Sequence, residues 1–97
     1  MSNSKLHVAE HDELFEAVLA LETIDDCYAF FEDLCTVKEI ISLAQRWQVA
    51  NLLSAGESYD AIVEKTGAST ATVSRVKRSL VYGADGYNRV LDRLDKK

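Results

Sequence analysis

Residues 67–80 read GASTATVSRVKRSL, a stretch with three basic residues and no acid. The chain around it is acidic, with a formal net charge of −5 over 97 residues. Glycine followed by serine and threonine is typical of a tight turn that leads into a capped helix. The stretch therefore predicts a turn at Gly67-Ala68 and a short basic helix that begins after Ser69 or Thr70.

A second, shorter helix is predicted directly before this turn, over about residues 58–66. A short helix, a glycine turn and a second helix of about three turns form the helix-turn-helix arrangement, in which the second helix enters the major groove of DNA. When the unit is counted from Tyr59, apolar residues stand at the positions where its two helices meet, namely Ile62, Ala68, Val73 and Val76. We therefore predict a helix-turn-helix over about residues 58–82.

The predicted basic helix has an inner and an outer face. At 100° per residue, Val73, Val76 and Leu80 share the inner face. Small and hydroxylated side chains in the first turn of the outer face suit contacts with base edges, and the basic residues further along suit phosphates. The residues predicted to contact DNA are Thr70, Ala71, Ser74, Arg75, Lys77 and Arg78.

The formal charge is distributed unevenly along the chain. Residues 1–67 carry −9, residues 68–83 carry +3 and residues 84–97 carry +1. A local basic face inside an acidic protein is the asymmetry that DNA binding produces. The alternative is a helical hairpin whose basic face is only solvated.

The rest of the chain is also predicted to be helical. It contains no proline and only four glycines, and its content of 47% apolar and 28% charged residues is that of a globular protein. Thr23 with Asp26, and Thr36 with Glu39, predict the starts of two further helices. We predict an all-α protein of about six helices, with a flexible tail over residues 1–12 and a single helical domain over residues 13–97.

The central helix, predicted over about residues 37–55, carries apolar residues around much of its circumference. Ile40, Trp47 and Leu52 are among them. Such a pattern indicates burial on several sides, which a chain of this length achieves with difficulty by itself. The pattern favours a homodimer. The alternative is a three-helix arrangement within one chain that buries the central helix.

Other classes of protein find little support in the sequence. There is no run of roughly 20 apolar residues and no signal peptide, so we predict a cytoplasmic protein without a membrane partner. Cys27 and Cys35 are predicted to be buried free thiols, and with His7 and His11 they do not form a metal site. No pair of carboxylates and no Cys-His or Ser-His pair has catalytic spacing, so no enzyme is predicted.

From about Leu14 to Leu94 the chain resembles the Trp repressor family, and more closely its TrpR-like YerC/YecD branch. The motifs that carry the resemblance are Cys35-Thr36 with Glu39, Leu43 to Arg46, Ala55-Gly56-Glu57 and GASTATVSRVKRSL. The resemblance implies six helices per chain, an intertwined homodimer and sequence-specific binding of double-stranded DNA in transcription regulation.

In the family that this chain resembles, tryptophan acts as corepressor, with its indole held between two arginines. The matching residues are Arg46 and Arg75, and Thr36 matches a threonine that helps to hold the amino group. Val76 stands where the family has glycine, and its side chain should partly fill the indole slot. We therefore expect no response to tryptophan, while another small amino-acid-like corepressor stays open. The alternative role for the two arginines is structural ion pairing with acids.

These observations together predict a homodimeric, sequence-specific DNA-binding transcriptional regulator. The alternative is a helical protein-interaction module that uses the basic helix on an acidic partner.

Overall fold

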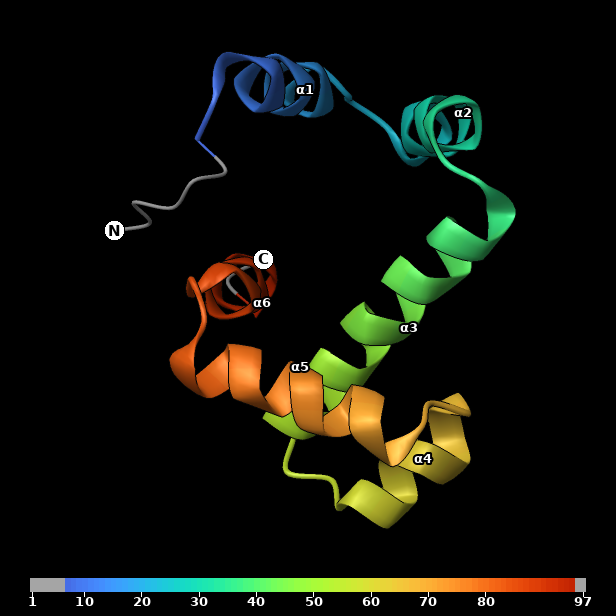
Figure 1. Cartoon of the computed structure of the whole chain (residues 1–97), viewed down its shortest axis with the longest axis vertical. Coiled ribbons are helices and arrows are strands. Elements are labelled where there is room, and N and C mark those ends of the chain that lie inside the picture. The colour runs from blue at the N-terminus through green and yellow to red at the C-terminus, as the bar shows by residue number, and fades with distance from the viewer. Residues whose placement is uncertain (1–6, 96–97) are drawn as a thin grey trace. The chain divides into compact units, whose positions relative to one another are not determined.

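The computed structural model describes residues 7–95 and shows only helices within them (Figure 1). The helices are α1 (Ala9–Leu19), α2 (Ile24–Leu34), α3 (Val37–Ser54), α4 (Tyr59–Thr66), α5 (Thr70–Tyr82) and α6 (Gly86–Asp95). The predicted all-α fold of six helices is confirmed. None of the helices in this range is long and apolar enough to cross a membrane.

The chain divides into two compact units, Met1–Ile40 and Ile41–Lys97. The first contains α1, α2 and the start of α3, and the second contains the rest of α3 with α4, α5 and α6. The single domain over residues 13–97 stays a prediction. The predicted tail extends too far into the chain, because α1 begins at Ala9, where Glu10 and Asp12 favour its first turn through the helix dipole. Residues 1–6 of that tail lie outside the described residues.

Side-chain caps determine where α2 and α3 begin. The Thr23 hydroxyl accepts a hydrogen bond from the Asp26 N–H at 3.0 Å. At the start of α3, Thr36 Oγ1 accepts from the Glu39 N–H at 3.1 Å, and Glu39 Oε1 accepts from the Thr36 N–H at 2.8 Å. This reciprocal pair is a capping box, which satisfies two backbone donors that the helix leaves unpaired. Both starts that the sequence predicted are confirmed.

The core of the second unit lies where α3, α4 and α5 meet, as the lower part of Figure 1 shows. Its buried residues are Val49, Ala50, Ile62, Ala68, Val73 and Val76. The four positions predicted as contacts between the two helices of the helix-turn-helix are all in this set, each with at most 2% of its surface exposed. Burial of this face of α5 turns the opposite face to solvent.

The two loops that bound α4 need left-handed backbone. Gly56 has φ of 88° and Gly67 has φ of 73°, a conformation that glycine adopts without a steric penalty. At the second loop, the Gly67 N–H donates to the Val63 carbonyl at 2.9 Å and ends α4. The predicted glycine turn is therefore confirmed.

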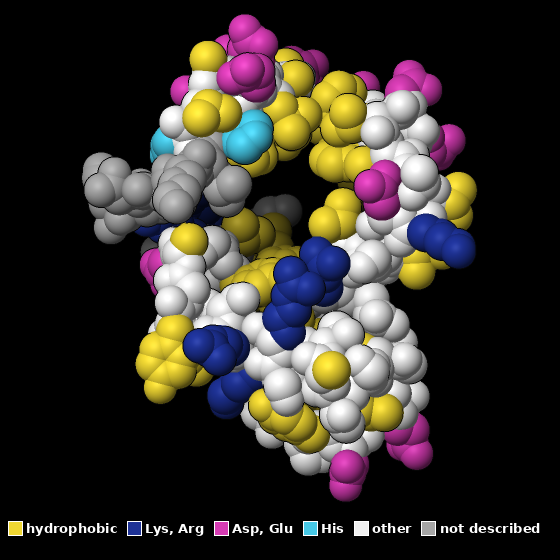
Figure 2. Space-filling view, in the orientation of Figure 1, with side chains coloured by type: hydrophobic (Ala, Val, Ile, Leu, Met, Phe, Trp, Pro, Cys, Tyr) yellow, Lys and Arg dark blue, Asp and Glu magenta, His cyan; other side chains and the backbone are white. Residues whose placement is uncertain are grey.

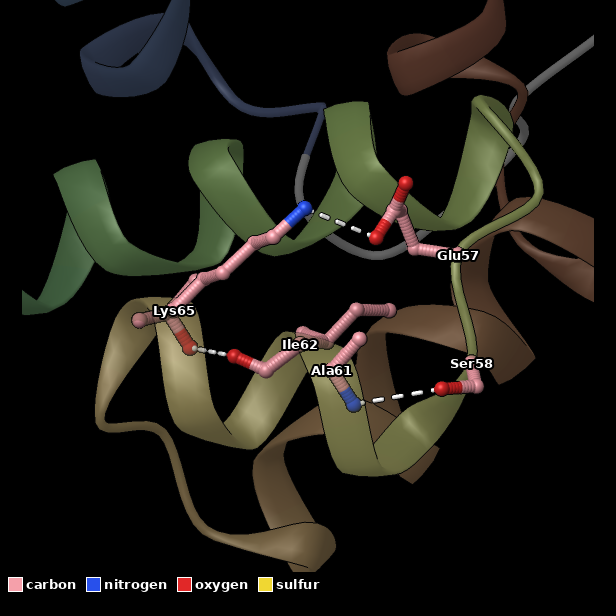
Figure 3. A network of polar contacts seen from close by, with 6 residues as sticks. Glu57, Ser58, Ala61, Ile62 and Lys65 are labelled. Atoms are coloured by element: carbon pink, nitrogen blue, oxygen red, sulfur yellow. Dashed lines mark hydrogen bonds and ion pairs between the residues drawn. The ribbon is translucent and has the colours of Figure 1, made fainter.

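Polar contacts hold α4 at both ends (Figure 3). Lys65 Nζ donates to Glu57 Oε1 at 2.8 Å, which ties the last turn of α4 to the loop before it. Ser58 caps the helix by accepting from the Ala61 N–H at 3.2 Å. Because both charged side chains of the ion pair are partly exposed, we expect it to contribute less than about 1 kcal/mol, and the apolar core to dominate.

The face of α2 that carries Ile24, Cys27 and Tyr28 is not buried within its unit. Ile24 is 74% exposed and Tyr28 is 65% exposed, while Cys27 is exposed and Cys35 is only partly buried. The prediction of two buried thiols is therefore wrong for the single chain. The physical reason is that no other helix of the first unit packs closely over this face of α2.

Candidate nucleic-acid interface

The N-terminus of α5 is held by a hydroxyl cap. Ser69 Oγ accepts from the Thr72 N–H at 3.1 Å, and the Ser69 hydroxyl also lies 3.1 Å from Thr72 Oγ1. Of the two predicted caps, Ser69 is therefore the one in use. The first turn of α5 contains no acid, so no carboxylate of that turn neutralises the positive end of the helix dipole. This end of the helix is suited to an approaching phosphate.

All six residues that the sequence predicted to contact DNA are exposed on α5. Four of them face away from the buried Val73 and Val76, and Thr70 and Lys77 lie on the flank of that face. Helix periodicity therefore produced the correct inner and outer faces. Figure 2 shows Lys and Arg side chains, in dark blue, grouped over α5 and the adjoining part of α3 in the second unit. The outer face of α5 combines small hydroxylated side chains in its first half with three cations further along.

The cations of this face have no acidic partners within residues 7–95. The two ion pairs in that range join Lys65 to Glu57 and Arg89 to Asp85, and neither involves a residue of α5. Arg46 and Arg75 take part in neither pair, so the alternative of structural ion pairing finds no support there. The positive charges of α5 are thus available to a polyanion.

The residues matched to a tryptophan site belong to both units. Thr36 is in the first unit, and its hydroxyl accepts the hydrogen bond that caps α3. Arg46 on α3 is partly buried and Arg75 on α5 is exposed. Val76, next to Arg75, is only 1% exposed and belongs to the core. The side chain of Val76 is therefore packed in the core, and the tryptophan site stays a prediction.

The described residues contain no cluster of three or more His, Cys, Asp or Glu side chains that could hold a metal ion. Cys27 and Cys35 both lie on or next to α2 in the first unit, whereas the helix-turn-helix belongs to the second. The chemistry that the second unit offers is therefore that of hydroxyl and cationic side chains on an exposed helix.

Sequence reasoning missed two contacts behind the interface. Gln45 Nε2 donates to the Thr66 carbonyl at 3.3 Å, and Trp47 stacks on Tyr87 with ring centroids 6.2 Å apart. Apolar residues recur at helical spacing along α6 at Tyr87, Val90, Leu91 and Leu94, a pattern that does not identify the partner of Tyr87. No sequence signal marks Gln45, because glutamine on a helix is usually solvated.

The family model described as Trp repressor protein matches residues 9–95, a range that includes all six helices. This chain belongs to the Trp repressor family. The uncharacterized protein YerC of Bacillus subtilis (strain 168) is 53% identical over 94 residues, which cover 97% of this chain and 90% of that protein. The predicted resemblance to the YerC branch is therefore confirmed.

Two crystal structures share the fold. A TrpR-like protein from Eubacterium eligens superposes with a TM-score of 0.92 at 55% identity, covering 96% of each chain. A candidate Trp repressor from Staphylococcus aureus also superposes with a TM-score of 0.92, at 54% identity, covering 100% of this chain and 97% of that one. The Trp repressor family is a family of regulators rather than enzymes.

Proposed function

We propose that this member of the Trp repressor family is a homodimeric, sequence-specific DNA-binding regulator of transcription. The observation that carries the proposal is the outer face of α5, which is exposed, basic and free of acids in a helix-turn-helix with a buried inner face. A helix of this kind enters the major groove with its first turns toward the base edges. The electrostatic attraction of its cations to phosphates drives the association.

The two halves of α5 have different roles in this proposal. Thr70, Ala71 and Ser74 lie in the first half and read base edges through hydrogen bonds and methyl contacts. Lys77 and Arg78 lie one turn further along and contact phosphates, while Arg75 stands between the two groups. Phosphate contacts position the protein, and base contacts specify the sequence.

Ser74→Ala and Thr70→Ala are expected to change which bases are preferred, by about 1 to 3 kcal/mol at an affected position. The reason is that each substitution removes one hydroxyl from the half of α5 that faces the bases. Selection of bound sequences from random duplex DNA, repeated with each variant, measures the change. If Ser74→Ala leaves every base preference intact, the assignment of the first half of α5 to base contacts is wrong.

Exposed apolar surface supports the homodimer. The first unit leaves Leu19 84% exposed and Val37 73% exposed, and neither α1 nor α2 buries a residue. An apolar hollow of about 220 Å³ lies beside Tyr28 and Phe31 in this unit, and one of about 550 Å³ lies beside Trp47 and Tyr87 in the other. Exposed apolar surface around such hollows favours an interaction site on a soluble protein. A second copy of the chain would cover it.

Sedimentation should show a species of twice the chain mass of 10.8 kDa at micromolar concentration. Ile41→Glu should shift this species toward the monomer, because Ile41 is an apolar residue of α3 that is 60% exposed in the single chain. Ser54→Glu adds the same charge at an exposed polar position on another face of α3 and should leave the dimer intact. A wild-type protein that sediments as a monomer at this concentration would refute the dimer.

The test of the proposed function is selection from random duplex DNA with the purified protein. Two-fold symmetry requires a roughly palindromic site with half-sites about one helical turn apart. Affinity for the selected site should fall linearly with salt in a log-log plot. Enrichment of single half-sites would contradict the symmetric dimer. If no duplex is enriched while an acidic protein partner binds α5, the protein-interaction alternative is correct.

Tryptophan is expected not to switch this protein. The side chain of Val76 adds three carbons where the family has glycine, and it lies in the core beside Arg75. Overpacking of this size costs about 1 to 3 kcal/mol, which lowers affinity by roughly tenfold to a hundredfold. Isothermal titration should therefore show no saturable binding at low micromolar tryptophan. Saturable binding in that range, together with tighter DNA binding, would show that the site accommodates Val76.

Val76→Gly is the complementary variant for this titration. It should open the indole slot and improve tryptophan binding while the protein stays folded. Because Val76 is a buried core residue, circular dichroism at the titration temperature must accompany the measurement.

A further inference from the structure

Three hydrogen bonds converge on Thr66, the last residue of α4. Its hydroxyl donates to the Ile62 carbonyl at 2.7 Å and accepts from the Ala68 N–H at 3.1 Å. Its carbonyl accepts from Gln45 Nε2 at 3.3 Å. Gln45 lies on α3, so this last bond joins the turn of the helix-turn-helix to a helix 21 residues away in the sequence.

Two of these bonds satisfy backbone groups that secondary structure leaves unpaired, namely the Ala68 N–H and the Thr66 carbonyl. Ala68 is 2% exposed, and a buried N–H without a partner is costly. The Thr66 carbonyl belongs to the last turn of α4, where helix geometry supplies no N–H donor within the helix. Neither the Ala68 N–H nor the Thr66 carbonyl pairs with a backbone group of α4 or α5. The side chains of Thr66 and Gln45 therefore decide whether the turn keeps its present conformation.

The position of this turn governs the position of α5. Ser69 caps α5 three residues after Thr66, and Thr70 and Ala71 follow directly. A displacement of the turn against α3 therefore moves the residues assigned to base edges.

We propose that Gln45 and Thr66 form a latch that positions α5 on α3 and thereby sets the selectivity of DNA binding. The proposal rests on the proposed function, in which α5 reads DNA and α3 belongs to the dimer scaffold. Gln45 and Thr66 are positioning residues, because they act through the turn and not through contact with DNA. In this latch, side chains of the protein itself hold α5 in place.

The latch can be tested without DNA by amide hydrogen exchange. Gln45→Glu replaces the donating amide by a carboxylate of the same shape, which cannot donate at neutral pH to the Thr66 carbonyl. Exchange at residues 66–68 should become about threefold to tenfold faster, the factor that corresponds to one ordinary hydrogen bond. Exchange in the last turn of α5 should not change. Gln48→Glu, with the same charge change at an exposed position of α3, should leave both segments as in the wild type.

Selectivity is measured as the ratio of affinities for the selected site and for an unrelated duplex. Gln45→Glu should lower this ratio about threefold to tenfold relative to Gln48→Glu. Added negative charge weakens binding to both duplexes equally, so the ratio isolates positioning from charge. If exchange at residues 66–68 is unchanged, the latch does not exist. If exchange rises and the ratio stays constant, the latch does not govern recognition.

Thr66 offers an independent pair of variants. Thr66→Val removes the hydroxyl at nearly constant volume and should lower the selectivity ratio, whereas Thr66→Ser keeps the hydroxyl and should retain it. If the Thr66 side chain acts only by filling space, serine should not restore the selectivity ratio. Equal selectivity ratios for Thr66→Val and Thr66→Ser would overturn the role of the hydroxyl. If the wild type itself shows no sequence preference, the proposed function fails, and the exchange measurement still decides whether the latch exists.

Discussion

Arg78→Ala should weaken binding to all DNA sequences alike, by about tenfold to a hundredfold at physiological salt. The log-log slope of affinity against salt should also become shallower by about 2 in the dimer, or about 1 for each phosphate contact removed. The physical reason is the position of Arg78 in the second half of α5, where it is exposed and has no acidic partner within residues 7–95. Salt titrations with the selected duplex and with a scrambled duplex measure both effects.

The matched control is Arg93→Ala. Arg93 carries the same charge and is exposed, but it lies in the last turn of α6. If slope and affinity depend on the net charge of the protein, the two variants should behave alike. If they depend on a phosphate contact by α5, only Arg78→Ala should change the slope. A change in base preference with Arg78→Ala would show that the register of α5 on DNA differs from the one proposed.

Ile62→Ala should destabilise the protein by about 2 to 5 kcal/mol. Ile62 is fully buried and connects α4 to the core of α3 and α5. Since that core contains six buried residues, the neighbouring side chains have few ways to fill the cavity. Urea unfolding at one fixed protein concentration measures the change, because the stability of a dimer depends on concentration.

Val81→Ala provides the comparison for this experiment. Val81 is an aliphatic residue of α5 that is 56% exposed, so its loss should change stability by no more than about 0.5 kcal/mol. A similarly small effect for Ile62→Ala would show that the helix-turn-helix core contributes little to global stability. A large effect for Val81→Ala would instead place Val81 in contact with a second copy of the chain.

The helix-turn-helix was predictable from sequence because its signals are local. The residue spacing of a helix-turn-helix unit identified the buried set Ile62, Ala68, Val73 and Val76, and helical periodicity identified the exposed face of α5. The turn requires a positive φ at Gly67, a conformation that favours glycine, so glycine in the sequence marks the turn. The capping pairs at the starts of α2 and α3 act over three residues. Each of these features depends on neighbours within about one or two helical turns.

The location of α1 and the state of the cysteines were less predictable. A polar first turn at Ala9 to Asp12 resembles a solvated tail in composition, although its acids favour a helix start. Cys27 was predicted to be a buried free thiol, yet the sequence does not specify what would cover this face of α2. In the single chain that face is exposed, and the proposed dimer supplies its cover.

The sequence by itself determined the six helices, the turn and the two faces of α5, because backbone hydrogen bonding and periodic burial act over short distances along the chain. Only the tertiary structure decided that Gln45 meets the carbonyl of Thr66 and that Trp47 stacks on Tyr87. These partners are 21 and 40 residues apart in the sequence. The packing of α3 against α4, α5 and α6 selects them, because many other side chains of suitable chemistry could have met there.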